Sequence, residues 1–178
     1  MPRSAPGPPD DALGYRARPA PRPGPAVLVL HSWWGMTSSF TEYADRLAAA
    51  GFITGCVDLY GGVIAATPDE AKALRSARRR EPMYRTMIRA CDGLLGDPAC
   101  SSHSVALVGF SMGGHWALWL SSQARPEVPQ ISATVVYYAT RACDFHASAA
   151  AYCTQKPCRF CRKSTMGLPL SPGSVVSA

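Results

Sequence analysis

The sequence lacks any apolar run of the ~20 residues that a helix needs to cross a bilayer, so we expect no membrane span. The N-terminal stretch also lacks the apolar segment of a secretory signal, and we therefore expect a cytoplasmic protein. Residues 1–25 instead hold eight of the sixteen prolines, which predicts disorder over residues 1–14. Basic residues do not alternate with aromatic ones, so the net charge of +6 does not indicate nucleic-acid binding.

Regularly spaced pairs of cysteines are also lacking. Four of the seven cysteines crowd into the C-terminal segment, at Cys143, Cys153, Cys158 and Cys161. Structural zinc usually takes two well-spaced pairs, whereas here only the last two form C-x-x-C. We therefore expect no metal and no other cofactor, with a zinc-binding tail left open as an alternative. An odd total without a signal peptide argues against a disulfide framework.

One stretch carries a motif for chemistry, the run from Val105 to Leu120. It opens with an apolar segment of strand length and closes with an apolar helix. Between them, Gly109, Ser111 and Gly113 form the pattern G-x-S-x-G. Strand, serine turn and helix together predict a nucleophile elbow, in which the serine is strained and the glycines let neighbouring backbone pass close by. The alternative is an ordinary glycine-rich turn with a capping serine.

Apolar runs of strand length recur along the chain and alternate with amphipathic helices. These runs cover residues 26–31, 52–57, 105–110 and 133–139. Continuous apolar runs suit strands buried on both faces, and this alternation implies parallel β-α-β units. Two helix starts are marked by capping boxes, Ser39-x-x-Glu42 and Thr67-x-x-Glu70. We therefore predict an α/β fold with a mostly parallel sheet.

The carboxyl ends of parallel strands meet at one edge of a sheet, so the residues that follow three of the predicted strands should converge. The motifs found there and nearby are His31–Gly35, Val57–Gly62, Gly109–Gly114 and Tyr137–Tyr138. In this order they resemble the dienelactone hydrolase family of α/β-hydrolases. The resemblance covers about residues 15–145. It implies a three-layer sandwich and a hydrolase of esters or lactones.

The resemblance also implies roles for individual residues. Ser111 matches the position of the nucleophile, although founding members of the family have cysteine there. The backbone N–H of Met112 and the backbone N–H of Trp33 match the two oxyanion donors. Tyr60 matches a tyrosine that contacts substrate, and Asp58 is expected to tie loops together.

The acid and the base of a catalytic triad are not found where the resemblance places them. In this fold they follow the serine in the order Asp, His, roughly fifty and roughly eighty residues later. These positions fall near Arg159 and beyond Ala178. No histidine follows His146, so we interpret the Asp and the His as lost. Asp144 and His146 stay open as an acid and a base.

The other three histidines have different expected environments. His31 ends a predicted strand, where it either approaches Ser111 or supports a loop. His103 lies in a polar serine stretch and is expected on the surface. His115 comes one helical turn after Ser111 and is expected to pack behind it.

After about Phe145 the apolar periodicity ends, and cysteine, arginine and proline replace it. We interpret this tail as the product of a frame shift, a retained intron or a truncated gene model, because it conflicts with the fold predicted for the rest. The sheet is therefore expected to lack its last strands. The predicted organisation is a disordered segment over 1–14, a partial α/β-hydrolase domain over 15–145 and an irregular tail over 146–178.

These observations predict a hydrolase of a small ester or lactone that uses Ser111 as its nucleophile. The expected partner is a small-molecule substrate, with no nucleic acid and no membrane, and the oligomeric state stays open. One alternative is an inactive remnant of the same fold. Another is a binding module whose cysteine tail holds zinc.

Overall fold

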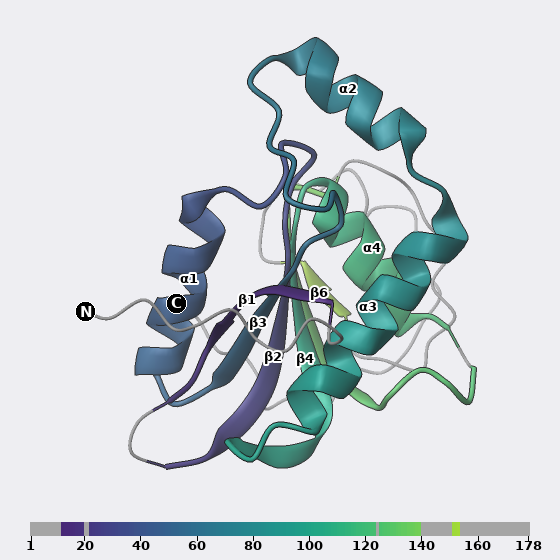
Figure 1. Ribbon diagram of the computed structural model, residues 1–178. Coiled ribbons are helices and arrows are strands. Elements are labelled where there is room, and N and C mark those ends of the chain that lie inside the picture. Colours follow the sequence, from purple (N-terminus) through teal and green to yellow (C-terminus); the bar gives the residue numbers. More distant parts are fainter. Residues whose placement is uncertain (1–11, 20–21, 124, 140–150, 154–178) are drawn as a thin grey trace.

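A computed structural model describes residues 12–19, 22–123, 125–139 and 151–153. Its centre is a six-stranded sheet with the strand order β1-β3-β2-β4-β5-β6 (Figure 1). The strands are β1 (Leu13–Ala17), β2 (Gly24–Leu30), β3 (Ile53–Val57), β4 (Cys100–Phe110), β5 (Ile131–Tyr137) and β6 (Ala151–Cys153). Only β1 is antiparallel to its neighbour, so the predicted mostly parallel sheet is confirmed.

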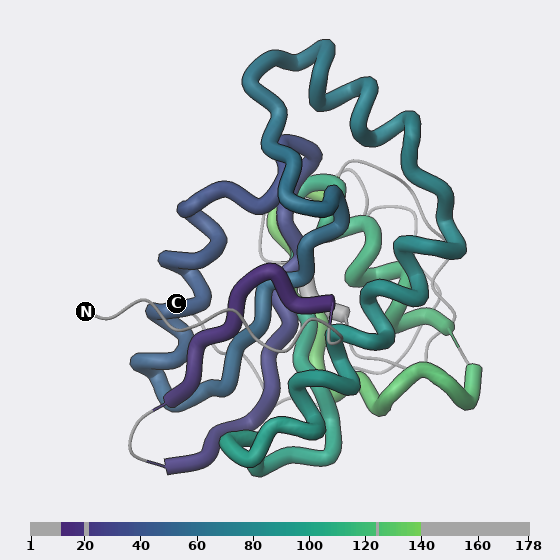
Figure 2. Tube along the Cα trace, viewed as in Figure 1, coloured from purple at the N-terminus to yellow at the C-terminus, as the bar shows by residue number. Residues whose placement is uncertain are grey.

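Helices cover both faces of this sheet. On one face, α1 (Ser38–Ala49) packs on β1 and β3, and on the other, α3 (Arg80–Leu95) and α4 (Met112–Ser121) pack on the central strands (Figure 1). This arrangement is the predicted three-layer sandwich. The remaining helix, α2 (Pro68–Ala77), stands apart, beyond the ends of the strands (Figure 2). Within the described ranges, no helix has the length and apolar character of a membrane span.

Three neighbouring strands, β3, β2 and β4, bring three loops to one edge of the sheet. The apolar residues of β2 and β3 are buried, as their continuous apolar runs predict. In the parallel register Leu30 pairs with Val57 on one side and with Gly109 on the other. The chain therefore leaves all three strands at the same edge, where His31, Asp58 and Ser111 follow.

One of the two predicted helix starts is correct. At α2 the hydroxyl of Thr67 accepts a hydrogen bond from the backbone N–H of Glu70, at 3.2 Å. At α1 the helix begins at Ser38, and the preceding Thr37 makes no side-chain capping bond. The predicted capping box at Ser39 is therefore wrong, because that residue already lies inside the helix.

The ends of the predicted domain differ from the described strands. β1 begins at Leu13, two residues before the predicted boundary at 15. β6 lies beyond the boundary at 145, where no further strand was expected, and it pairs with Thr134–Val136 of β5. Its three residues are an isolated short run, too short to give a strand pattern in the sequence. Residues 1–11 and most of the tail lie outside the described residues.

Candidate active site

Ser111 has the backbone conformation of a nucleophile elbow. It lies between β4 and α4 with φ 53° and ψ −111°, a region that non-glycine residues rarely adopt. Two backbone hydrogen bonds hold it there. Its N–H donates to the carbonyl of Tyr137 at 2.7 Å, and its own carbonyl accepts from the N–H of His115 at 3.2 Å. An ordinary capping turn would not require this strain.

The glycines around the elbow allow backbone to approach closely. A Cβ added to Gly113 would lie 2.3 Å from the carbonyl oxygen of Leu30 and 2.4 Å from that of His31. A Cβ added to Gly109 would lie 2.4 Å from the carbonyl oxygen of Gly113. The first turn of α4 can therefore rest on the end of β2 only because these residues carry no side chain, as predicted.

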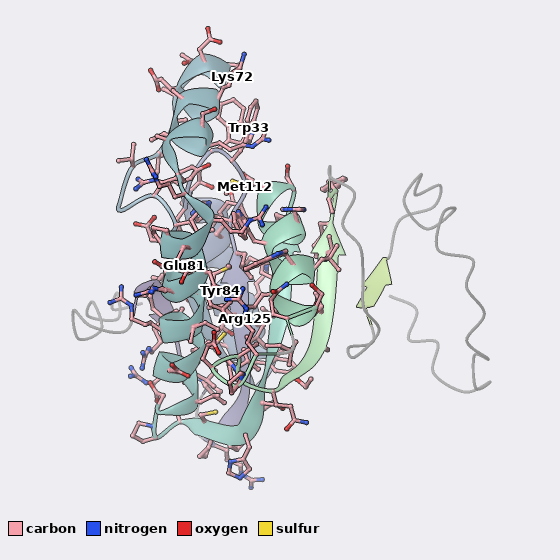
Figure 3. The ribbon with its side chains drawn as sticks, turned by 90° about the vertical axis from the view of Figure 1, so that its right-hand side faces the viewer. Trp33, Lys72, Glu81, Tyr84, Met112 and Arg125 are labelled. Carbon is pink, nitrogen blue, oxygen red and sulfur yellow. The ribbon has the colours of Figure 1, made fainter. Side chains whose placement is uncertain are left out.

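Ser111 lines a cavity of about 540 Å³. Three of the four predicted site residues meet there, because Trp33 and Met112 line it as well. Figure 3 shows these two residues at the same end of the molecule, below α2. Each comes from a segment that follows a parallel strand. The other lining residues are Arg75, Ser76, Arg78, Arg80, Met83, His115 and Trp116.

Tyr60 does not reach the cavity, which corrects its predicted contact with substrate. Its side chain has no exposed surface, and its hydroxyl lies 3.2 Å from the sulfur of Met112. Tyr60 therefore lies behind Met112, inside the core. Asp58 was predicted to tie loops together, but its two carboxylate bonds stay within its own loop, where it accepts from the backbone N–H groups of Tyr60 and Gly62.

His31 supports two loops and is not placed to act as a base. Its Nε2 accepts a hydrogen bond from the backbone N–H of Leu59 at 3.0 Å, so the ring proton is on Nδ1, which donates to the carbonyl of Ser32 at 2.6 Å. Burial lowers its pKa below the usual 6.5, although the bond to Ser32 and the charge of Asp58 act in the opposite direction. Both ring nitrogens of the neutral form are thus occupied.

This burial predicts a loss of stability in mild acid. Unfolded His31 takes up a proton near pH 6.5, whereas the folded side chain resists protonation, so the unfolding free energy should fall as the pH drops below about 6.5. Urea unfolding between pH 8 and pH 5 measures this slope. His31→Gln should flatten it and the exposed His103→Gln should not. A midpoint that stays constant or rises toward pH 5 would contradict the assignment.

His115 lines the cavity, whereas the sequence predicted packing behind the nucleophile. His115 comes four residues after Ser111, a spacing that places two side chains on the same face of a helix. This spacing was the signal that could have placed His115 in the cavity. Its Nδ1 is buried with no hydrogen-bond partner in the part of the chain that is described. Burial, and then the charge of Arg80, lower its pKa. His146 and Asp144 lie outside the described residues.

Three arginines line the cavity, and no pattern in the sequence indicated them. They are Arg75 at the end of α2, Arg78 between the helices and Arg80 at the start of α3. The guanidinium of Arg78 donates to the carbonyl of Tyr60 at 2.7 Å, and that of Arg80 lies over the ring of Trp119. No acidic side chain is among the described residues that line this space. The site is therefore strongly cationic.

Comparison with known proteins agrees with this architecture. A model of the dienelactone hydrolase family matches residues 13–156. The chain belongs to this family. A protein of Aquifex aeolicus named "Putative carboxymethylenebutenolidase" is 31% identical over 131 residues, which are 70% of this chain and 55% of that protein. The chain thus spans about half the length of the curated relatives that it matches.

Solved structures show the same fold. The "Putative Dienelactone Hydrolase" of Klebsiella pneumoniae is 20% identical with a TM-score of 0.62, over 79% of this chain and 62% of that one. A dienelactone hydrolase-like promiscuous phosphotriesterase from metagenomic libraries is 22% identical with a TM-score of 0.59, over 74% and 56%. At these identities the likeness concerns the fold alone.

A dienelactone hydrolase with a serine nucleophile also needs an acid and a base. The position expected for the acid, near Arg159, lies outside the described residues. So do three of the four tail cysteines, and for the fourth, Cys153, only the backbone is described. Among the residues that are described, no cluster of three His, Cys, Asp or Glu side chains could hold a metal.

Proposed function

We propose that this chain supplies the nucleophile and the oxyanion site of a hydrolase for a small ester or lactone. The observation that carries the proposal is the strained elbow of Ser111 at the wall of a cavity. The hydroxyl of Ser111 attacks the carbonyl carbon, the alkoxide leaves with a proton, and water then releases the acyl group. The N–H groups of Trp33 and Met112 stabilise the oxyanion of each tetrahedral intermediate.

The acid and the base of the triad are proposed to be lost from this chain, with Asp144 and His146, which lie outside the described residues, left open as the pair. His31 has both ring nitrogens occupied, His103 is exposed, and no histidine follows His146, which leaves His115 as the one described histidine that lines the cavity with Ser111. The alternative is an inactive remnant of the fold. Ester turnover that does not change on Ser111→Ala would favour that alternative.

The cationic wall of the cavity supports a substrate that carries a carboxylate beside its ester. Arg75, Arg78 and Arg80 offer charge-assisted hydrogen bonds to such a group, and no acidic residue competes for them among the described lining residues. The Aquifex relative is named for a carboxymethylenebutenolide, a lactone with a carboxyl group. We therefore propose anionic esters or lactones as the substrate class.

We expect a preference for the anion over its neutral analogue. Mono-4-nitrophenyl adipate and methyl 4-nitrophenyl adipate share a leaving group and differ in one charge. The kcat/KM of the acid should be about tenfold higher, the value of one charged hydrogen bond. Arg75→Gln should reduce this ratio several-fold, whereas Lys72→Gln, on the same helix and away from the cavity, should preserve it. Equal kcat/KM values in the wild type would refute the substrate class.

A further inference from the structure

The two proposed oxyanion donors lie on different elements. The N–H of Met112 is at the start of α4, and the N–H of Trp33 is in the loop after β2. Two donors stabilise an oxyanion only when both point at one position, at about 3 Å from it. Residues behind the cavity must therefore fix the two segments relative to each other.

Tyr60 is held in a way that fixes Met112. Its backbone N–H donates to the carboxylate of Asp58 at 2.8 Å, and its carbonyl accepts from Arg78 at 2.7 Å. With both backbone groups bonded and the ring buried, its hydroxyl is a fixed point. That hydroxyl donates to the sulfur of Met112 at 3.2 Å, so Tyr60 sets the position of the residue whose N–H is one donor.

His31 acts on the other donor through a shared peptide group. Its Nδ1–H donates to the carbonyl of Ser32 at 2.6 Å, and this carbonyl belongs to the same planar unit as the N–H of Trp33. In a trans peptide the two groups point in opposite directions. A hydrogen bond that fixes the carbonyl therefore also fixes the direction of the N–H, and it polarises that donor.

The two side chains also contact each other. The rings of His31 and Tyr60 meet edge to face, with their centroids 5.0 Å apart. We infer that His31 and Tyr60 form a positioning pair behind the cavity, which holds the N–H groups of Trp33 and Met112 in the relative orientation that oxyanion binding requires. The inference rests on the proposed function. Both residues are buried, lie outside the cavity lining and act through the donors, so neither contacts substrate.

Tyr60→Phe tests the pair, with Tyr84→Phe as its matched control. Both tyrosines are almost fully buried in the same core, and the hydroxyl of Tyr84 bonds the side chains of Glu127 and Arg125, neither of which lines the cavity. With mono-4-nitrophenyl adipate, Tyr60→Phe should lower kcat about tenfold and keep KM within about twofold, because a displaced donor weakens only transition-state binding. Tyr84→Phe should keep both values. The melting temperatures of the two variants should fall equally.

A double-mutant cycle shows whether Tyr60 acts through Met112. Met112→Leu removes the sulfur and keeps the N–H. If Tyr60 acts through Met112, adding Met112→Leu to Tyr60→Phe should lower kcat little further. For His31, the test compares two variants. Glutamine offers a hydrogen-bond donor and an acceptor and leucine offers neither, so His31→Gln should keep part of the kcat that His31→Leu loses.

The outcomes separate the inference from the function on which it rests. In one outcome, Ser111→Ala loses the wild-type turnover but Tyr60→Phe and Tyr84→Phe have the same kcat. This outcome overturns the inference and leaves the proposed function standing. An additive cycle also overturns the inference. A wild type whose turnover does not depend on Ser111 overturns the proposed function, and the inference with it.

Discussion

Gly113→Ala is expected to lower the free energy of unfolding by about 5 kcal/mol, an exceptional value for one added methyl group. The new Cβ would lie 2.3 Å and 2.4 Å from two carbonyl oxygens at the end of β2. Both are backbone atoms, one of the last residue of β2 and one of the residue after it, so no side-chain rotation relieves the overlap. The start of α4 would have to move away from β2, and Ser111 would move with it.

Gly96→Ala is the matched control for this prediction. Gly96 follows α3 with φ −79°, and the atom nearest to an added Cβ there is 3.3 Å away. Alanine fits this conformation, so a change within about 1 kcal/mol is expected. Urea unfolding of the two variants against the wild type measures the difference. If Gly113→Ala is as stable as Gly96→Ala, the close approach of α4 and β2 is wrong.

Ser111→Ala is expected to reduce kcat for ester hydrolysis at least about tenfold, because no other group can form the acyl-enzyme, and the interpreted loss of the acid and the base limits the size of the effect. Stability should change little. Alanine must adopt the same positive φ as the serine, and the side chain of Ser111 makes no capping bond to α4.

The control for this variant lies on the same helix. Ser122→Ala, just beyond the far end of α4, removes a hydroxyl that bonds the carbonyl of Trp119 and should keep full turnover. Release of 4-nitrophenolate from the adipate monoester measures both variants. If Ser111→Ala keeps more than a tenth of the wild-type kcat, Ser111 is not the nucleophile.

The elbow was predictable because its signal is local. Strand, G-x-S-x-G and helix follow one another within Val105–Leu120, and the structure keeps that order. The positions of Trp33 and Met112 near Ser111 were predictable for a related reason. Each follows a strand of the parallel sheet, and the carboxyl ends of such strands meet at one edge.

Features that depend on contacts distant in sequence were not predictable. Tyr60 was expected to contact substrate, but its hydroxyl faces Met112, fifty-two residues away. The sequence did not indicate that the arginines at 78 and 80 line the cavity, because nothing local shows that α2 carries the chain over it. Buried Asp97 pairs with Arg16 and Arg18, about eighty residues earlier, which no local pattern indicates.

The most direct test of the central claim is covalent labelling of the protein with an alkyl fluorophosphonate. A nucleophilic serine displaces fluoride and forms a stable bond to phosphorus, so one turnover leaves a permanent adduct. Intact mass and peptide mapping should show one adduct per chain, on Ser111, and none on Ser111→Ala. An adduct on another residue, or equal labelling of the wild type and Ser111→Ala, would contradict the account.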